Sequence, residues 1–266
     1  MIGVVVPAHD EEAHLAACLA ALQAAARCER LAGEAVMVVV ALDACTDGTA
    51  GIARAHGAIT VAIDERNVGV ARARGADIAL AAGARWLAFT DADTVVSPGW
   101  IADQLAQQSD AVCGTVEVRD WGGWGRQGML LKRRLGAFYT DADGHRHIHG
   151  ANLGVSAKAY RRVGGFRALA SSEDVALVNA LRDSGATIAW SAAPRVVTSA
   201  RPHFRAPGGF GATLERLAKG DQPGNGHAVR PVRSVRPARP AHPAHPAPAT
   251  PLIARMPRIE PEGGPA

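Results

Sequence analysis

Over the first hundred residues, short apolar runs alternate with amphipathic segments, and this alternation limits the possible fold more than any other feature. Runs rich in β-branched residues predict strands at 2–7, 36–42, 59–63 and 86–89, and the segments between them show helical spacing of apolar side chains. Strands that alternate with helices form βαβ units, which build a parallel sheet. The alternation therefore predicts an α/β fold with helices flanking the sheet and a ligand site at the carboxyl ends of the strands.

The pattern changes after residue 110, where the chain becomes a mixture of short strands and helices. Ser172 precedes the helix predicted at 173–184, where its side chain can cap that helix. The strands are predicted at 111–118, 149–155, 187–191 and 195–198, and the helices at 129–139 and 173–184.

From residue 221 onward the chain is dense in Pro, Ala, Arg and His and has almost no large apolar side chains. Such a segment cannot repay the entropy lost on ordering. We expect one domain over 1–220, divided into halves at 1–110 and 111–220, followed by a disordered tail over 221–266.

Composition excludes several classes of protein. Hydrophobic residues make up 48% of the chain, but no apolar run reaches the roughly 18–20 residues that cross a bilayer. The N-terminus meets acidic residues after a short apolar run, so we expect no signal peptide and a cytoplasmic location. The four cysteines lack the spacing of a zinc site or a disulfide framework. Much of the net charge of +4 comes from arginines near the C-terminus, so no nucleic-acid partner is expected.

The sequence TDAD occurs twice, in different surroundings. The first copy follows the strand predicted at 86–89, so Asp91 and Asp93 would lie at the carboxyl edge of the sheet. Their oxygens suit Mg²⁺ or Mn²⁺, although a D-x-D alone is as well explained by a polar strand end before a turn. The second copy follows a helical segment and runs into Asp143-Gly144, a turn signal. We interpret it as a structural or acceptor-side loop.

Two families carry a D-x-D like the first copy. FTDADTVV at 89–96 is similar to the nucleophile motif of the haloacid-dehalogenase-like phosphohydrolases, which would make Asp91 the nucleophile and Asp93 the acid/base. That motif belongs near the N-terminus and is followed by an acidic pair at a later strand end. Here predicted βα units precede the motif and no GDxxxD follows it.

The second family, the family 2 glycosyltransferases, resembles the chain in several separate segments that occur in the right order. His9, Asp10 and Ala73 depart from the family pattern, in place of tyrosine, asparagine and asparagine. The resemblance covers residues 2 to about 200, and its segments are VVVPAHDEE (4–12), VVVALDACTDGTAGIA (38–53), ERNVGVARARGADIAL (65–80), the D-x-D, HGANLGVSAKAYRRVGGF (149–166) and SSEDVALVNAL (171–181).

This resemblance implies a GT-A fold, with a mixed, mainly parallel sheet flanked by helices. It also implies a nucleotide-diphospho-sugar donor and a divalent metal, Mn²⁺ or Mg²⁺. The half at 1–110 would bind the donor, and the half at 111–220 would bind an acceptor that could be a glycan, a lipid or a small metabolite. Asp91 and Asp93 would hold the metal and Arg72 would contact the phosphates. The family's nucleoside pocket maps onto Pro7, His9, Glu11 and Asp43.

Family members that invert stereochemistry use a carboxylate at the "ED" position as general base, which maps onto Asp174 with Glu173 beside it. Acidic residues in a first helical turn are also stabilised by the helix dipole, and both explanations can hold at once. A non-catalytic sugar-nucleotide binder and a D-x-D phosphohydrolase remain as alternative functions.

Three further features are open. In the loop after the last predicted strand, Arg201 and Arg205 could close on the diphosphate, and His203 is either a third metal ligand or an ordinary loop histidine. Trp121 and Trp124 either stack on a sugar or pack beneath a glycine-rich loop. The basic, apolar helix at 129–139 either touches a membrane surface or is a solvated face.

Overall fold

A computed structural model describes residues 1–137, 139–202 and 210–220 of the 266-residue chain. All of the described residues belong to a single compact unit. The predicted tail at 221–266 lies outside the described residues, as do His203 and Arg205. In chain order the elements are β1 (Ile2–Ala8), α1 (Leu15–Ala26), η1 (Glu29–Leu31), β2 (Val36–Asp43), α2 (Thr49–Ala55), β3 (Ile59–Ile63), α3 (Val68–Ala81), β4 (Trp86–Phe89), β5 (Thr94–Val96), α4 (Trp100–Ala106), β6 (Ala111–Gly114), η2 (Gly122–Gln127), α5 (Gly128–Gly136), η3 (Gly150–Asn152), β7 (Leu153–Ser156), α6 (Ala157–Arg162), α7 (Glu173–Asp183), β8 (Ile188–Ser191), β9 (Val196–Thr198) and α8 (Phe210–Lys219).

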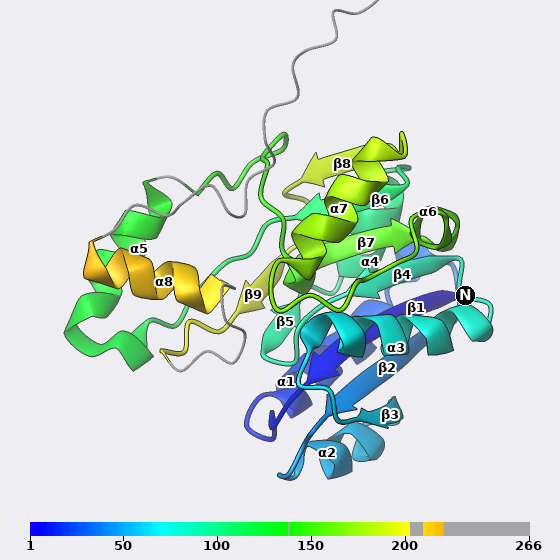
Figure 1. The fold of residues 1–266 in the computed structure, drawn as a ribbon, viewed down its shortest axis with the longest axis horizontal. Helices are drawn as coiled ribbons and strands as arrows, with labels where there is room; N and C mark the ends of the chain where they lie inside the picture. The colour runs from blue at the N-terminus through cyan, green and yellow to red at the C-terminus, as the bar shows by residue number, and fades with distance from the viewer. Residues whose placement is uncertain (138, 203–209, 221–266) are drawn as a thin grey trace, which may run out of the picture. The chain divides into compact units, whose positions relative to one another are not determined.

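The described residues form a seven-stranded sheet in the order β3-β2-β1-β4-β7-β6-β8 and a separate two-stranded sheet of β5 and β9. Strands β3, β2, β1 and β4 are parallel neighbours, whereas β7 runs antiparallel to both β4 and β6. Strand β8 is parallel to β6. The predicted mixed, mainly parallel sheet flanked by helices is therefore confirmed (Figure 1).

Helices cover both faces of the large sheet. Successive side chains of a strand point to opposite faces, so one strand contributes to both buried clusters. Val4 and Val6 of β1 belong to one buried cluster, which includes side chains of α1, α2 and α4. Val5 belongs to a second cluster, with side chains of α3, α6 and α7. Figure 1 shows α3 and α7 on the same side of the sheet. The fully apolar strand sequences follow from this burial on both faces.

Several predicted element ends are wrong, mainly in the second half of the chain. The strand expected at 111–118 ends at Gly114, and the one expected at 149–155 begins only at Leu153, after a 3-10 turn. Ser172 does not cap α7, because it adopts a left-handed conformation (φ 61°) and its side chain makes no capping hydrogen bond. In α3, by contrast, the Asn67 side chain accepts a hydrogen bond from the Val70 N–H at 3.0 Å.

A third, smaller apolar cluster joins α5, α8 and the segment before α5. Trp121 is buried and its indole N–H donates to the Val118 carbonyl, while the Trp124 indole N–H donates to the Ala200 carbonyl. These contacts favour the packing interpretation of the tryptophan pair. Helices α5 and α8 lie side by side (Figure 1). Within the described residues, no helix is both long enough and apolar enough to cross a bilayer.

An ion pair between the segments before β2 and β4 predicts a pH-dependent stability. Arg85 donates to both oxygens of Glu34, at 2.7 and 2.5 Å, and this holds the pKa of Glu34 at about 2, below its usual value of 4.5. A depressed pKa stabilises the fold above the unfolded value and loses that contribution as pH falls towards the folded value. Because Arg85 is mostly exposed, we expect Glu34→Gln to cost only about 1 kcal/mol at pH 7.

Urea unfolding of both proteins between pH 7 and pH 2 measures this contribution. The difference between wild type and Glu34→Gln should shrink as pH falls from about 4.5 to 2. Glu29→Gln is the control, because Glu29 is exposed and forms no ion pair with another described residue. A difference that stays constant across this range would contradict the assigned ion pair.

Candidate active site

A cavity of about 650 Å³ opens at the carboxyl ends of β1, β2 and β4, the place that the parallel topology predicts for a ligand. Its walls come from both halves of the domain, since residues before β7, after β9 and at the start of α7 and α8 complete it. Every predicted site residue that the structure describes lines this cavity, namely Pro7, His9, Glu11, Asp43, Arg72, Asp91, Asp93, Glu173, Asp174 and Arg201.

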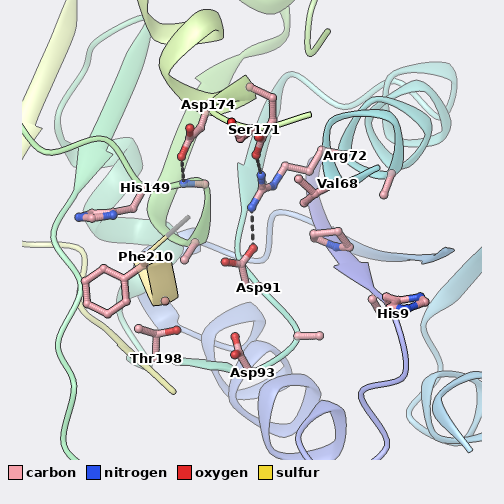
Figure 2. Close-up of a pocket in the computed structure, with 18 of the residues that line it drawn as sticks. His9, Val68, Arg72, Asp91, Asp93, His149, Ser171, Asp174, Thr198 and Phe210 are labelled. Atoms are coloured by element: carbon pink, nitrogen blue, oxygen red, sulfur yellow. Dashed lines mark hydrogen bonds and ion pairs between the residues drawn. The ribbon is translucent and has the colours of Figure 1, made fainter. Parts of the chain in front are cut away.

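The first TDAD begins immediately after β4, so its two aspartates lie at the edge of the sheet (Figure 2). The Asp91 side chain is 34% exposed and that of Asp93 is 14% exposed. Burial, with the nearby charge of Asp91, raises the pKa of Asp93 to about 6. Two carboxylates held this close at a buried position favour a cation between them.

Arg72 binds Asp91 from inside the protein. It is buried on α3, and its two terminal nitrogens contact different carboxylates, with Nη2 donating to Asp91 at 2.6 Å and Nη1 to Glu173. Burial opposes the charged form of Arg72, but the two carboxylates outweigh it and raise its pKa above the usual value. Arg72 therefore does not lie on a solvated helix face, whereas Arg74, two residues further along α3, is exposed.

The backbone beside Arg72 leaves room only for glycine at one position. A Cβ atom at Gly150 would lie 2.4 Å from the Arg72 guanidinium, so a larger residue would displace the arginine. The guanidinium also lies 5.6 Å from the centre of the Phe166 ring. The segment HGANLGVS therefore supports the position of Arg72 as well as forming a cavity wall.

A second arginine occupies the other side of the D-x-D. Arg201 donates to both oxygens of Glu11, at 2.8 and 2.6 Å, and its Nη2 lies 3.2 Å from Asp93. Glu11 is buried, and its backbone N–H donates to the Thr49 hydroxyl at 2.7 Å. Each aspartate of the D-x-D thus has an arginine beside it, and the two arginines approach from different elements.

Glu173 and Asp174 are neighbours in the chain but differ in environment. Glu173 is buried against Arg72, and burial raises its pKa above the usual value. Asp174 accepts hydrogen bonds from the Gly150 and Val175 N–H groups, both at 2.8 Å, and lines the cavity (Figure 2). These two donors fix the orientation of the Asp174 carboxylate. Of these two carboxylates, that of Glu173 is paired with Arg72, whereas that of Asp174 is in no ion pair with another described residue.

On the opposite wall, Asp43 organises the loop that follows β3. Its carboxylate accepts hydrogen bonds from the backbone N–H groups of Glu65, Arg66 and Asn67, at 2.8, 2.8 and 2.7 Å. The His9 Nδ1 lies 2.6 Å from the Asp43 carbonyl oxygen. Asp43 therefore fixes the loop and His9 together at the mouth of the cavity.

The second TDAD holds two loops of the fold together. Asp141 accepts from the Thr115 hydroxyl at 2.7 Å and pairs with Arg195, and Asp143 accepts from the Ala192 N–H at 2.8 Å. None of its carboxylates lines the cavity. The interpretation as a structural loop therefore agrees with the contacts.

Sequence reasoning missed part of the cavity wall. Asn67, Ser171, Thr198 and Phe210 line it, yet none is among the site residues that the sequence predicts, although Asn67 and Ser171 lie in family-like segments. Asn67 is the exception in part, because an asparagine directly before a helical pattern is an N-cap signal. The others could be placed only once the topology was known.

The carboxylates of the D-x-D are suitable ligands for a divalent cation. Asp91 and Asp93 supply hard oxygen donors at the cavity, and burial together with the nearby charge of Asp91 raises the pKa of Asp93. Among the described residues, no group of three His, Cys, Asp or Glu side chains is arranged to hold a metal. His203, the third ligand considered above, lies outside those residues.

The family model "Glycosyl transferase family 2" matches residues 3–164, which include the D-x-D and the Gly150 segment. The chain belongs to this glycosyltransferase family. The resemblance seen in the sequence is thereby confirmed. No curated protein matches the chain.

Solved structures with the same fold confirm the GT-A-like architecture. TarS from S. aureus in complex with UDP-GlcNAc is 17% identical, with a TM-score of 0.56, over 82% of this chain and 65% of that one. The mannosyltransferase PcManGT from Pyrobaculum calidifontis, in complex with GDP-Man and Mn²⁺, is 19% identical, with a TM-score of 0.55, over 82% and 60%. Glucosyl-3-phosphoglycerate synthase from Mycobacterium tuberculosis, in complex with Mn²⁺, UDP and glucosyl-3-phosphoglycerate, is 18% identical, with a TM-score of 0.53, over 82% and 77%. The chain thus spans less than two thirds of TarS and of PcManGT.

Proposed function

We propose that the protein transfers a sugar from a nucleotide-diphosphate donor to an acceptor hydroxyl, with a divalent metal held by Asp91 and Asp93. The observation that carries this proposal is the pair of carboxylates at the carboxyl end of β4, inside a cavity that Asp174 also lines. Family membership supports it. The solved neighbours bind UDP-GlcNAc, GDP-Man or UDP, so the fold accepts more than one nucleoside.

The two arginines would have different tasks in this reaction. When bound, a divalent metal would neutralise the diphosphate leaving group. Arg72 has both terminal nitrogens on carboxylates, so we assign it the positioning of Asp91. Arg201 lies at the cavity surface beside Asp93 and would add positive charge where the diphosphate binds.

We assign Asp174 the role of general base and infer that the sugar is transferred by a direct displacement. Asp174 would take the proton of the acceptor hydroxyl while the hydroxyl oxygen forms a bond to the anomeric carbon of the sugar. The nucleoside diphosphate would leave from the opposite face, with inversion. The two backbone N–H groups on Asp174 support this role, because they hold the carboxylate in one orientation. Glu173 is less suited, since its charge is already paired with Arg72.

A thermal-shift panel of UDP-, GDP- and dTDP-linked compounds, each with and without Mn²⁺, tests the donor and the metal together. A ligand that binds only the folded protein adds about 2.7 kcal/mol of stability at a hundred times its Kd. That gain corresponds to several degrees for a domain of this size. We expect a shift with one nucleoside that is larger when Mn²⁺ is present.

Asp93→Asn should abolish the Mn²⁺-dependent part of this shift, because an amide is a weaker ligand and carries no charge. The substitution removes a buried like charge, so we expect the metal-free protein to keep its stability. Asp77→Asn, at an exposed position on α3, is the matched control and should shift like wild type. A full Mn²⁺ response in Asp93→Asn would remove the metal site from the proposal.

Product analysis separates the two alternative functions. A non-catalytic binder would show the thermal shift but release no nucleoside diphosphate, even by hydrolysis of the donor. A phosphohydrolase would release inorganic phosphate from phosphoesters without a nucleotide sugar. The family match and the position of the D-x-D after three βα units favour neither alternative.

A further inference from the structure

Two large apolar side chains stand exposed next to each other at the start of α5. Met129 is 73% exposed and Leu130 is 36% exposed. Among the described residues, the other large apolar side chains with comparable exposure are Ile59 and Val95, which lie on separate strands. Single exposed apolar residues are ordinary, but an adjacent pair on a short helix is a feature that needs an explanation.

The same stretch is strongly basic. Arg126, Lys132 and Arg133 are exposed and form no ion pair with another described residue. The sequence has no acidic residue between Asp120 and Asp141. We call the group formed by Arg126, Met129, Leu130, Lys132 and Arg133 the α5 surface.

The opposite side of α5 is firmly packed, so the α5 surface is presented by a fixed helix. Leu131 is fully buried in the cluster that includes Leu214 and Leu217 of α8. Arg134 donates to the Leu217 carbonyl at 2.5 Å, near the C-terminal end of α8. The buried face explains the apolar side chains that point towards α8, but it leaves Met129 and Leu130 unexplained.

We propose that the α5 surface binds the headgroup region of an anionic lipid bilayer. Three exposed cations complement anionic headgroups, and each lysine or arginine near such a surface strengthens binding about fivefold. The apolar pair gives this surface a part that can enter the boundary between headgroups and acyl chains. A nucleic acid would match the cations but would leave the apolar pair in water.

This surface lies outside the cavity, so the proposal does not depend on glycosyl transfer. The two regions are nevertheless connected through α8, which packs on α5 and begins at Phe210, a residue of the cavity wall (Figure 1). A bilayer bound to α5 would therefore be linked to the cavity wall through one helix, α8. Phe210 also contacts the ring of His149 edge-on, at 5.9 Å between centres.

Co-sedimentation of the full chain with vesicles tests the proposal. We expect binding to phosphatidylcholine vesicles that contain phosphatidylglycerol, weaker binding to pure phosphatidylcholine, and a loss of affinity as salt rises. Lys132→Glu/Arg133→Glu should weaken the binding at least about twentyfold. Lys158→Glu/Arg162→Glu is the matched control, because it makes the same charge change at exposed positions of α6, away from α5 (Figure 1).

A second pair of variants tests the apolar contribution at constant charge. Met129→Ser/Leu130→Ser should weaken binding to the anionic vesicles several-fold, whereas Ile59→Ser should not change it. All substituted side chains are exposed, and circular dichroism checks that each variant is folded. Both results together would support insertion at the bilayer surface.

Three outcomes would overturn the proposal. The first is a wild-type chain that does not bind the anionic vesicles. The second is a Lys132→Glu/Arg133→Glu variant that binds like wild type, because arginines elsewhere, such as those at 230–258, would then carry the binding. The third is a Met129→Ser/Leu130→Ser variant with undiminished binding, because a charge-only surface would fit any polyanion, including RNA.

Discussion

Asp174→Asn is expected to lower kcat by about 10²- to 10⁴-fold while leaving the KM for the donor nearly unchanged. An asparagine side chain has the size of the aspartate and can still accept the hydrogen bond from Gly150, but it cannot take the acceptor's proton. Because the loss concerns proton transfer in the transition state, ground-state binding of the donor should persist. Steady-state rates of nucleoside diphosphate release, measured against donor concentration, give both constants.

The control for this result lies at the other end of the same helix. Asp183 is exposed at the C-terminal end of α7, so Asp183→Asn should have wild-type kinetics. A kcat of Asp174→Asn within tenfold of wild type would remove Asp174 from the role of base. Loss of donor binding would instead show that the carboxylate helps to shape the cavity. The thermal-shift panel distinguishes these two outcomes without requiring turnover.

The first half of the fold could be predicted closely from the sequence because its strands are apolar runs that alternate regularly with helical segments. The runs at 36–42 and 59–63 became β2 (Val36–Asp43) and β3 (Ile59–Ile63) almost unchanged. In the second half, β6 and β7 have four residues each, too few to show a period. There the side chain of Asn152 sets the backbone path, since it bonds the carbonyls of Thr115 and Pro194 and the indole of Trp100.

The sequence could predict which residues form the candidate site, but it could not predict which of their side chains pair with one another. Pro7, Asp43 and Asp91 meet because β1, β2 and β4 are parallel and end at one edge. The pairing of Arg72 with Glu173 joins residues 101 positions apart, and that of Arg201 with Glu11 joins residues 190 positions apart. No local pattern encodes such pairs, because they depend on how the second half folds back over the first.

The buried pair of Arg72 and Glu173 leads to the largest expected effect on stability. Arg72→Met should destabilise the fold by about 3–5 kcal/mol, because it leaves the buried Glu173 carboxylate without a counter-charge. Asp91 would lose its partner as well, but it is partly exposed and can be solvated. The free energy of unfolding in urea measures the loss. Arg74→Met, two residues away on the exposed side of α3, should change it by less than about 0.5 kcal/mol.

The double variant Arg72→Met/Glu173→Leu decides whether the loss comes from the unpaired charge or from packing. If the buried charge is the cause, an apolar side chain at 173 should restore much of the stability, since well-packed apolar residues often replace a buried ion pair without loss. The two substitutions would then be strongly non-additive, because they affect one contact. Additive losses would show that Arg72 stabilises the fold chiefly through its packing against Phe166 and Gly150. In either case the double variant should have little activity, because Asp91 would no longer be held towards the cavity by Arg72.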